Sequence, residues 1–292
     1  MPDAKAVPAL RPFLALVGGA IAIGFAPIFV RWSEVGLNAT AFWRLALALP
    51  ALGLLARRNA EPLLPSRGHR LLAVAGLCFA LDLCFWHASI ALTSVANATL
   101  LANLTPILVV LFYWLVFRKR PTLRFSAGVL LALSGAAGLA FGSGSRASIA
   151  GGNVVLGDLY GVTTAVAYAG YLLAVERARK TTSGLQVTLA STAVAMLITG
   201  GVALFFGENF WPVSTTGWAV LAGLALLVHV LGQGGIIWAL GQLPAALSSV
   251  VILIQPVVAA GLGWLLLGEA LGPLDALCAG LVLGGVLICR RQ

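Results

Sequence analysis

The sequence predicts an all-α integral membrane protein of ten transmembrane helices, arranged as two inverted repeats of five helices. Three observations indicate this fold class: the composition, ten separate apolar segments and a pattern that recurs in the second half of the chain. The chain has 292 residues, of which 60% are hydrophobic and 9% are charged, with a mean hydropathy of +1.01. Soluble domains carry about 25% charged residues, so we expect lipid rather than water around most of this chain.

The apolar segments supply the second observation, because each is long enough to cross a hydrocarbon core that needs about 20 residues of helix. The expected spans are residues 12–32, 38–56, 70–92, 95–117, 123–142, 155–176, 186–207, 217–241, 245–267 and 273–290. The first span follows Lys5 and Arg11, as the apolar part of a signal peptide would. Its apolar stretch of about eighteen residues is longer than a typical signal segment, so we expect a membrane helix.

Short breaks delimit the remaining spans in order. Basic clusters follow the second, fourth and sixth spans, at 57–58, 118–120 and 177–180. Prolines or short polar turns separate the others, for example Pro244 before the ninth span and Pro273 at the start of the tenth. No connection exceeds about a dozen residues, so we expect no soluble domain.

Charge is distributed unequally between the two sides of the predicted bundle. With ten crossings, both termini lie on the same side as the second, fourth, sixth and eighth connections. That side holds 15 of the 18 basic residues: Lys5, Arg11, Arg57, Arg58, Arg67, Arg70, Arg118, Lys119, Arg120, Arg124, Arg177, Arg179, Lys180, Arg290 and Arg291. Positive charge stays in the cytoplasm, so we predict cytoplasmic termini. The net charge of +9 therefore reflects orientation in the membrane, and we expect no nucleic-acid partner.

The third observation is an internal repeat. The stretch TPILVVLFYWLVFRKR at 105–120 resembles QPVVAAGLGWLLLGEA at 255–270, and in both a tryptophan follows the proline by eight residues. The first copy ends on three basic residues, whereas the second ends on Gly-Glu-Ala. Because a repeat of five helices is odd, its second copy crosses the membrane in the opposite sense, so the two ends face opposite sides. The halves are expected at 1–147 and 148–292, an arrangement typical of transporters.

The third span contains a carboxylate near its middle. An acid there costs roughly 2.5–3.5 kcal/mol on insertion scales, so Asp82 is expected to face protein or water. At helical spacing it shares a stripe with Phe79 and Trp86, which we place on a substrate cavity. Asp82 is either a proton carrier or a structural carboxyl bonded to a neighbouring helix. Arg44 is expected to snorkel toward head groups, with pairing to Asp82 as the alternative.

Other polar side chains within the spans are candidates for the same cavity. The eighth span places His229 and Gln233 four residues apart, on one helical face, and His87 neighbours Trp86 in the third. A histidine in the membrane can couple transport to protons or join two helices. In the sixth span Thr164, Tyr168 and Tyr171 form a stripe with Tyr160, suited to stacking on an aromatic substrate or to an interfacial belt. The fourth and ninth spans add Thr99, Asn103, Ser249 and Gln255.

Prolines and glycines suggest how the helices bend and pack. Pro106 and Pro256 lie within spans and serve as either hinges or static kinks. Gly280 and Gly284 form a small-residue motif in the tenth span, and Gly128 and Ala132 form the corresponding motif in the fifth. Such motifs serve packing within one chain or dimerisation, so we expect a monomer or weak dimer. The cysteines Cys78, Cys84, Cys278 and Cys289 lack metal or redox spacing, so we expect no metal or cofactor.

Four segments carry a resemblance to a known family. They are FWRLALA at 42–48, SVANATLLANLTPILVVL at 94–111, LGDLYG at 156–161 and PAALSSVVILIQPVVAAGLGWLLLGEAL at 244–271. The chain resembles, over its whole length, the EamA-type ten-helix carriers of the drug/metabolite transporter superfamily, and is similar to YddG-type amino-acid exporters. The resemblance implies export or exchange of small organic molecules across a bacterial inner membrane. It also implies a cavity between the first, third, fourth, sixth, eighth and ninth helices, with the fifth and tenth behind them. The chain departs from the family at 118–120, where many members carry Gly-Glu-Arg.

Other functions fit the sequence less well. An intramembrane enzyme would use Asp82 with Asp158, but Asp158 lies near the outer end of its span and no Gly-x-Gly-Asp motif is present. A channel would show a repeated filter or a ring of like charges. A sugar-phosphate or nucleotide-sugar carrier would need several basic residues in its cavity. We therefore expect neutral or aromatic amino acids and related metabolites as cargo, with proton coupling as an option.

Overall fold

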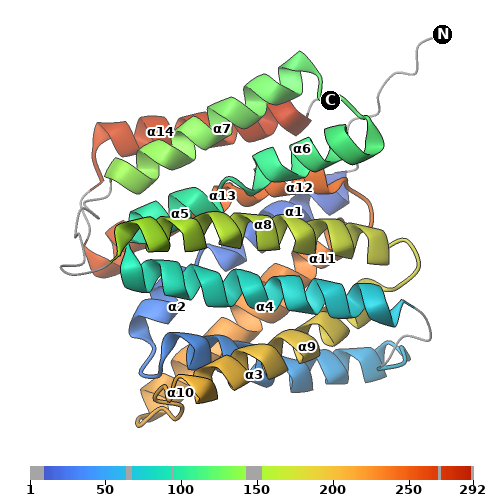
Figure 1. The fold of residues 1–292 in the computed structure, drawn as a ribbon, viewed down its shortest axis with the longest axis vertical. Helices are drawn as coiled ribbons and strands as arrows, with labels where there is room; N and C mark the ends of the chain where they lie inside the picture. The colour runs from blue at the N-terminus through green and yellow to red at the C-terminus, as the bar shows by residue number, and fades with distance from the viewer. Residues whose placement is uncertain (1–9, 64–67, 94, 143–152, 269–270, 291–292) are drawn as a thin grey trace.

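The computed structural model describes residues 10–63, 68–93, 95–142, 153–268 and 271–290, and within these ranges it contains helices but no strand (Figure 1). The helices are α1 (Leu10–Ile23), α2 (Ala26–Trp32), α3 (Leu37–Arg58), α4 (His69–Leu92), α5 (Val95–Ala102), α6 (Thr105–Phe117), α7 (Leu123–Gly142), α8 (Val154–Ala178), α9 (Gly184–Phe205), α10 (Thr215–Gly223), the π-helix η1 (Leu224–Gln233), α11 (Gly234–Ala239), α12 (Ala245–Ile252), α13 (Ile254–Leu267) and α14 (Pro273–Arg290). Grouped by span, they form ten helices that are long and apolar enough to cross a membrane. The predicted fold class and number of spans are confirmed.

Four of the ten spans are not regular α-helices. The first breaks between α1 and α2, the fourth between α5 and α6, and the ninth between α12 and α13. The eighth passes through the ten-residue π-helix η1. The sequence indicated bends only at Pro106 and Pro256. The break near Phe25, one residue before α2, and the π-helix were not predicted.

The helices form three groups along the longest axis of the molecule (Figure 1). The pair α7 and α14 lies at one end, and α3, α9 and α10 lie at the other. Between them α4 packs along α8, with α1, α5, α6, α12 and α13 nearby. The fifth and tenth spans are thus peripheral, as the family resemblance implied, and the central spans can enclose a site.

The α3–α9 pair is antiparallel, and its two ends are held in equivalent ways. Glu208, three residues after α9, accepts hydrogen bonds from Asn38 Nδ2 (2.7 Å) and Ala39 N (2.9 Å) at the start of α3. Glu61, three residues after α3, accepts a hydrogen bond from the hydroxyl of Ser183, the N-cap of α9. A carboxylate at a helix N-terminus is favourable because it meets unpaired N–H groups and the positive end of the helix dipole.

Glu34 performs a similar role between α2 and α10. Its carboxylate accepts hydrogen bonds from the Ser214 hydroxyl and from the backbone N–H groups of Ser214 (3.0 Å) and Val213 (2.9 Å). The bond from the Ser214 hydroxyl is the main cause that lowers the pKa of Glu34 below its ordinary value. The connection after the first span therefore fixes the start of the eighth.

The fourth and ninth spans end in the same backbone conformation. Arg118 closes α6 at φ 55°, and its N–H bonds to Tyr113 O; Gly268 closes α13 at φ 68°, and its N–H bonds to Gly263 O. The repeat detected in the sequence thus extends to the cap geometry. The boundary predicted between residues 147 and 148 falls in 143–152, outside the described residues, and it stays a prediction.

The α7–α14 contact uses the small residues expected on α7 but is shifted along α14. A Cβ on Gly128 would lie 3.0 Å from Gly285 O, and a Cβ on Gly285 would lie 2.6 Å from Ala132 N, so the two backbones meet there. Gly280 has no neighbour within 4 Å on that side. The predicted partners Gly128 and Ala132 are therefore confirmed, and a Cβ on Gly284 would lie 3.8 Å from Leu131 of α7, but the closest approach on α14 is at Gly285 and Gly280 takes no part in it.

Candidate functional site

A cavity with about 970 Å³ of empty space, including the part open to solvent, lies between the central helices. Its lining comes from both halves of the chain, and it includes both proline positions, Pro106 and Pro256. Ten of the predicted site residues line it: Phe79, Asp82, Trp86, Thr99, Asn103, Thr164, Tyr168, Gln233, Ser249 and Gln255. The sequence analysis therefore named ten of the 23 lining residues.

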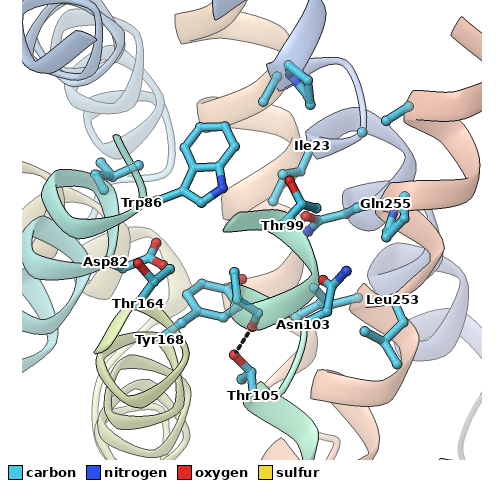
Figure 2. A pocket seen from close by; sticks show the side chains of 18 of the residues that line it. Ile23, Asp82, Trp86, Thr99, Asn103, Thr105, Thr164, Tyr168, Leu253 and Gln255 are labelled. Atoms are coloured by element: carbon cyan, nitrogen blue, oxygen red, sulfur yellow. Dashed lines mark hydrogen bonds between the residues drawn. The ribbon is translucent and has the colours of Figure 1, made fainter. Parts of the chain in front are cut away.

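The polar groups of the cavity face one another from opposite walls (Figure 2). Asp82 and Trp86 project from α4, beside Tyr168 from α8. Asn103, from the break between α5 and α6, and Gln255 from α13 project from the other side. Aromatic and amide groups dominate this arrangement, which suits a small solute that combines an apolar body with a few polar atoms.

Arg44 lies on the cavity, and the predicted snorkelling toward head groups is wrong. Its side chain is 7% exposed, and its guanidinium carbon lies 5.8 Å from the centre of the Phe79 ring. Among the described residues, neither a hydrogen bond nor an ion pair within 4 Å joins it to Asp82. Arg44 and Asp82 therefore line one cavity without a direct bond between them.

Tyr171 supports the cavity wall from behind and does not line it. Its ring stacks on Phe79 at 4.9 Å between centroids and lies 5.7 Å from the ring of Tyr168. Its hydroxyl accepts a hydrogen bond of 2.9 Å from Gln233 Nε2. The stripe predicted on α8 is thus divided, with Tyr168 facing the cavity and Tyr171 holding Phe79 and Gln233 in place.

The two candidate histidines also lie outside the lining. His229 is 1% exposed, and its Nε2 lies 2.7 Å from the hydroxyl oxygen of Thr192 on α9. The prediction that His229 and Gln233 share a face assumed α-helical spacing. The π-helix η1 has a turn of between four and five residues, so positions four apart still lie on one side: the His229 ring lies 5.7 Å from the Phe79 ring, and Gln233 bonds to Tyr171, which stacks on Phe79. Of the two, only Gln233 lines the cavity. His87 is 3% exposed and packs beside Trp86, with ring centroids 5.3 Å apart.

The spans that contain Pro106 and Pro256 both break at the cavity. The span of α5 and α6 is interrupted at Asn103–Leu104, and that of α12 and α13 at Leu253. Pro106 has no N–H to pair with Ala102 O four residues earlier. The Thr105 hydroxyl donates to that carbonyl instead, at 2.8 Å, as the dashed line in Figure 2 marks. The sequence analysis missed Thr105, although a hydroxyl next to a mid-helix proline is a usable signal.

A second polar network joins three helices outside the lining of the cavity. The Tyr113 hydroxyl lies 2.5 Å from the carboxylate of Glu176, which also accepts a hydrogen bond of 3.3 Å from Ala245 N. Tyr113 lies seven residues beyond Pro106, which is about 10 Å along α6. The network thus joins α6, α8 and α12 at the end that carries Arg118. Sequence analysis missed it because Glu176 lies at the margin of its span.

No group of three His, Cys, Asp or Glu side chains in the described ranges is arranged to hold a metal ion.

Comparison with known proteins gives three results. The model of the EamA-like transporter family matches the chain twice, at residues 10–141 and 155–291. One solved structure, described only as the crystal structure of a protein, is similar with a TM-score of 0.82 at 18% identity, covering 96% of this chain and 98% of the other. At that identity the similarity shows the fold alone. No curated protein matches the sequence.

Proposed function

The chain belongs to the EamA-like transporter family, and from this premise we propose that it is a secondary-active carrier of small organic metabolites that works by alternating access. Family membership makes it a multi-pass membrane protein and a small-molecule transporter, as the resemblance in the sequence implied. The proposal adds the cargo, which is neutral or aromatic amino acids and related compounds. It also adds the place, a bacterial cytoplasmic membrane with both termini in the cytoplasm.

One observation carries the mechanism: the cavity is lined by the joints of two broken helices, one from each half of the chain. A helix that is interrupted at the binding site can bend there without losing further hydrogen bonds. Two such helices, related by the repeat, allow the access path to change sides while the site stays in place. The Tyr113–Glu176–Ala245 network then acts as the closed gate on the side of Arg118.

The chemistry of the lining supports amino-acid-like cargo. Trp86 and Tyr168 offer aromatic surface, and Asn103 and Gln255 offer amides. Arg44 is the one basic residue among the described lining residues, whereas a sugar-phosphate or nucleotide-sugar carrier would need several cations. The amino-acid assignment accordingly has more support than the phosphorylated alternatives of the same superfamily.

Counterflow in liposomes tests the proposal. Purified protein is reconstituted into vesicles loaded with one unlabelled L-amino acid, and uptake of the same labelled compound is followed outside. A carrier should show saturable uptake that depends on the internal amino acid. Uptake that is independent of internal cargo, with conductance at high single-unit rates, would identify a channel instead. A panel of aliphatic and aromatic amino acids then defines the cargo.

A further inference from the structure

Arg44 is a buried cation that makes no hydrogen bond to any residue in the described ranges. It is 7% exposed, it lines the cavity, and its Nε has no hydrogen-bond partner among the described residues. A guanidinium offers five N–H donors in a fixed fork, which matches a carboxylate. Burying a charge without such a partner costs free energy, so an anion bound beside Arg44 would stabilise the protein.

Asn103 presents a second unused donor to the same space. Its Nδ2 is buried and has no hydrogen-bond partner in the described part of the chain. The residue stands at the break between α5 and α6, and Figure 2 shows its side chain projecting from the wall opposite Asp82. Two unpaired donors on one cavity favour binding of a ligand that carries a hydrogen-bond acceptor.

Phe79 holds the guanidinium in position before any cargo arrives. The guanidinium carbon of Arg44 lies over the Phe79 ring, and that ring is 2% exposed and stacked on Tyr171. A cation on an aromatic face is stabilised without using up its hydrogen-bond donors. Arg44 is thus fixed in place while its N–H groups stay available to a ligand.

We infer that Arg44 and Asn103 form a carboxylate-binding subsite, so that the cargo of this carrier has a free carboxylate. The inference rests on the proposed function as a small-molecule carrier, and it specifies which group of the cargo the protein recognises. Arg44 selects by charge and Asn103 adds one donor at the point where the helix breaks. A contrasting role for Arg44, in which it only balances Asp82 through water, would make binding indifferent to the carboxylate.

Ligand-dependent thermal stability of the purified protein in detergent separates these roles. The probes are L-alanine, L-leucine and L-phenylalanine, each compared with its amide and with its des-amino carboxylate (propionate, 4-methylpentanoate and 3-phenylpropionate). A ligand that binds the folded state raises the unfolding temperature, and the rise grows with the logarithm of its concentration divided by its dissociation constant. We expect at least one amino acid and its des-amino carboxylate to stabilise the protein, and the matching amide to have no effect.

Substitutions at Arg44 and Asn103 test whether these two residues cause the stabilisation by carboxylate probes. Arg44→Gln should weaken binding of the carboxylate probe by about tenfold to a hundredfold, the range of a charge-assisted hydrogen bond, and abolish the preference over the amide. Arg44→Lys should restore part of it, and Asn103→Ala should weaken it less than Arg44→Gln. Arg31→Gln removes an exposed arginine outside the cavity and is the matched control.

Each possible result of these measurements either supports or overturns the carboxylate-binding subsite. Equal stabilisation by an acid and its amide, or a preference that survives Arg44→Gln, overturns the subsite while leaving the carrier function intact. Stabilisation by the des-amino carboxylates alone supports the subsite and removes amino acids as cargo. Absence of stabilisation by every carboxylate probe, in protein that unfolds cooperatively, also overturns the inference.

Discussion

Glu61 and Glu208 hold reciprocal positions in the α3–α9 pair: each follows one helix by three residues and accepts hydrogen bonds at the N-terminus of the other. The two contacts lie at opposite ends of the antiparallel pair. They therefore tie the same two spans, one from each half, at both sides of the bundle. Neither carboxylate lines the cavity.

Removal of either carboxylate should loosen one end of this pair. Glu208→Ala leaves Asn38 Nδ2 and Ala39 N without their partner and should destabilise the protein by about 0.5–2 kcal/mol, the usual value of a helix cap. Glu208→Gln keeps an acceptor and should lose less. Thermal unfolding in detergent measures both. An unchanged unfolding temperature for Glu208→Ala and Glu61→Ala would show that the caps do not contribute to stability.

The proline joints should affect turnover more than binding. Pro106→Ala combined with Pro256→Ala allows both spans to form continuous helices, which should stiffen them and lower the counterflow rate severalfold at nearly unchanged cargo affinity. Pro50→Ala is the matched control, because Pro50 lies inside α3 with an exposed side chain. A folded double variant with normal turnover would make Pro106 and Pro256 static kinks.

The closed side of the cavity should open when its network is weakened. Tyr113→Phe removes the hydrogen bond to Glu176, and Glu176→Gln weakens acceptance from Ala245 N. Backbone amides of 245–249 should then exchange with deuterated solvent faster in both variants. Tyr160→Phe, which alters a tyrosine packed on Phe85 elsewhere in α8, serves as the control. Unchanged exchange in Tyr113→Phe and Glu176→Gln would contradict a gating role.

Asp82 is the residue to test for proton coupling. Asp82→Asn keeps the shape of the side chain and should fold normally. If Asp82 carries the proton, the variant should retain cargo exchange, which moves no net proton, and lose accumulation driven by a pH gradient. Liposomes with and without an imposed gradient measure both. Full gradient-driven uptake would exclude this role, and equal loss of both activities with lower stability would indicate a structural carboxyl.

Orientation can be tested with reporter fusions at described positions. Fusions after Arg120 and Lys180 should report the cytoplasm, and fusions after Glu34 and Glu208 the opposite side, because positive charge is retained in the cytoplasm. The signal at Glu208 is the most informative, since it lies in the second half. A cytoplasmic signal there would refute the predicted orientation.

The sequence predicted correctly those features that depend on apolar run length and on regular α-helical spacing. Apolar runs defined the spans, and helical spacing placed Asp82, Trp86 and Tyr168 on one cavity. Prediction failed where a tertiary contact decides. His229 lies beside the Thr192 hydroxyl instead of lining the cavity, and Arg44 packs on the aromatic face of Phe79 instead of reaching outward. Glycine spacing on α14 allowed two faces, and only packing against α7 selected that of Gly285.

The equivalent helix ends at Arg118 and Gly268 differ in how well the residue suits the backbone conformation. Both residues adopt the left-handed conformation, which glycine accepts freely and which costs a residue with a Cβ roughly 1–2 kcal/mol. In the finished protein glycine would therefore suit position 118 better. In the orientation predicted from the charge distribution, an arginine at 118 would act during insertion of the chain, when its charge would keep this helix end from crossing the bilayer. The predicted topology would thus account for a residue that the folded backbone alone does not favour.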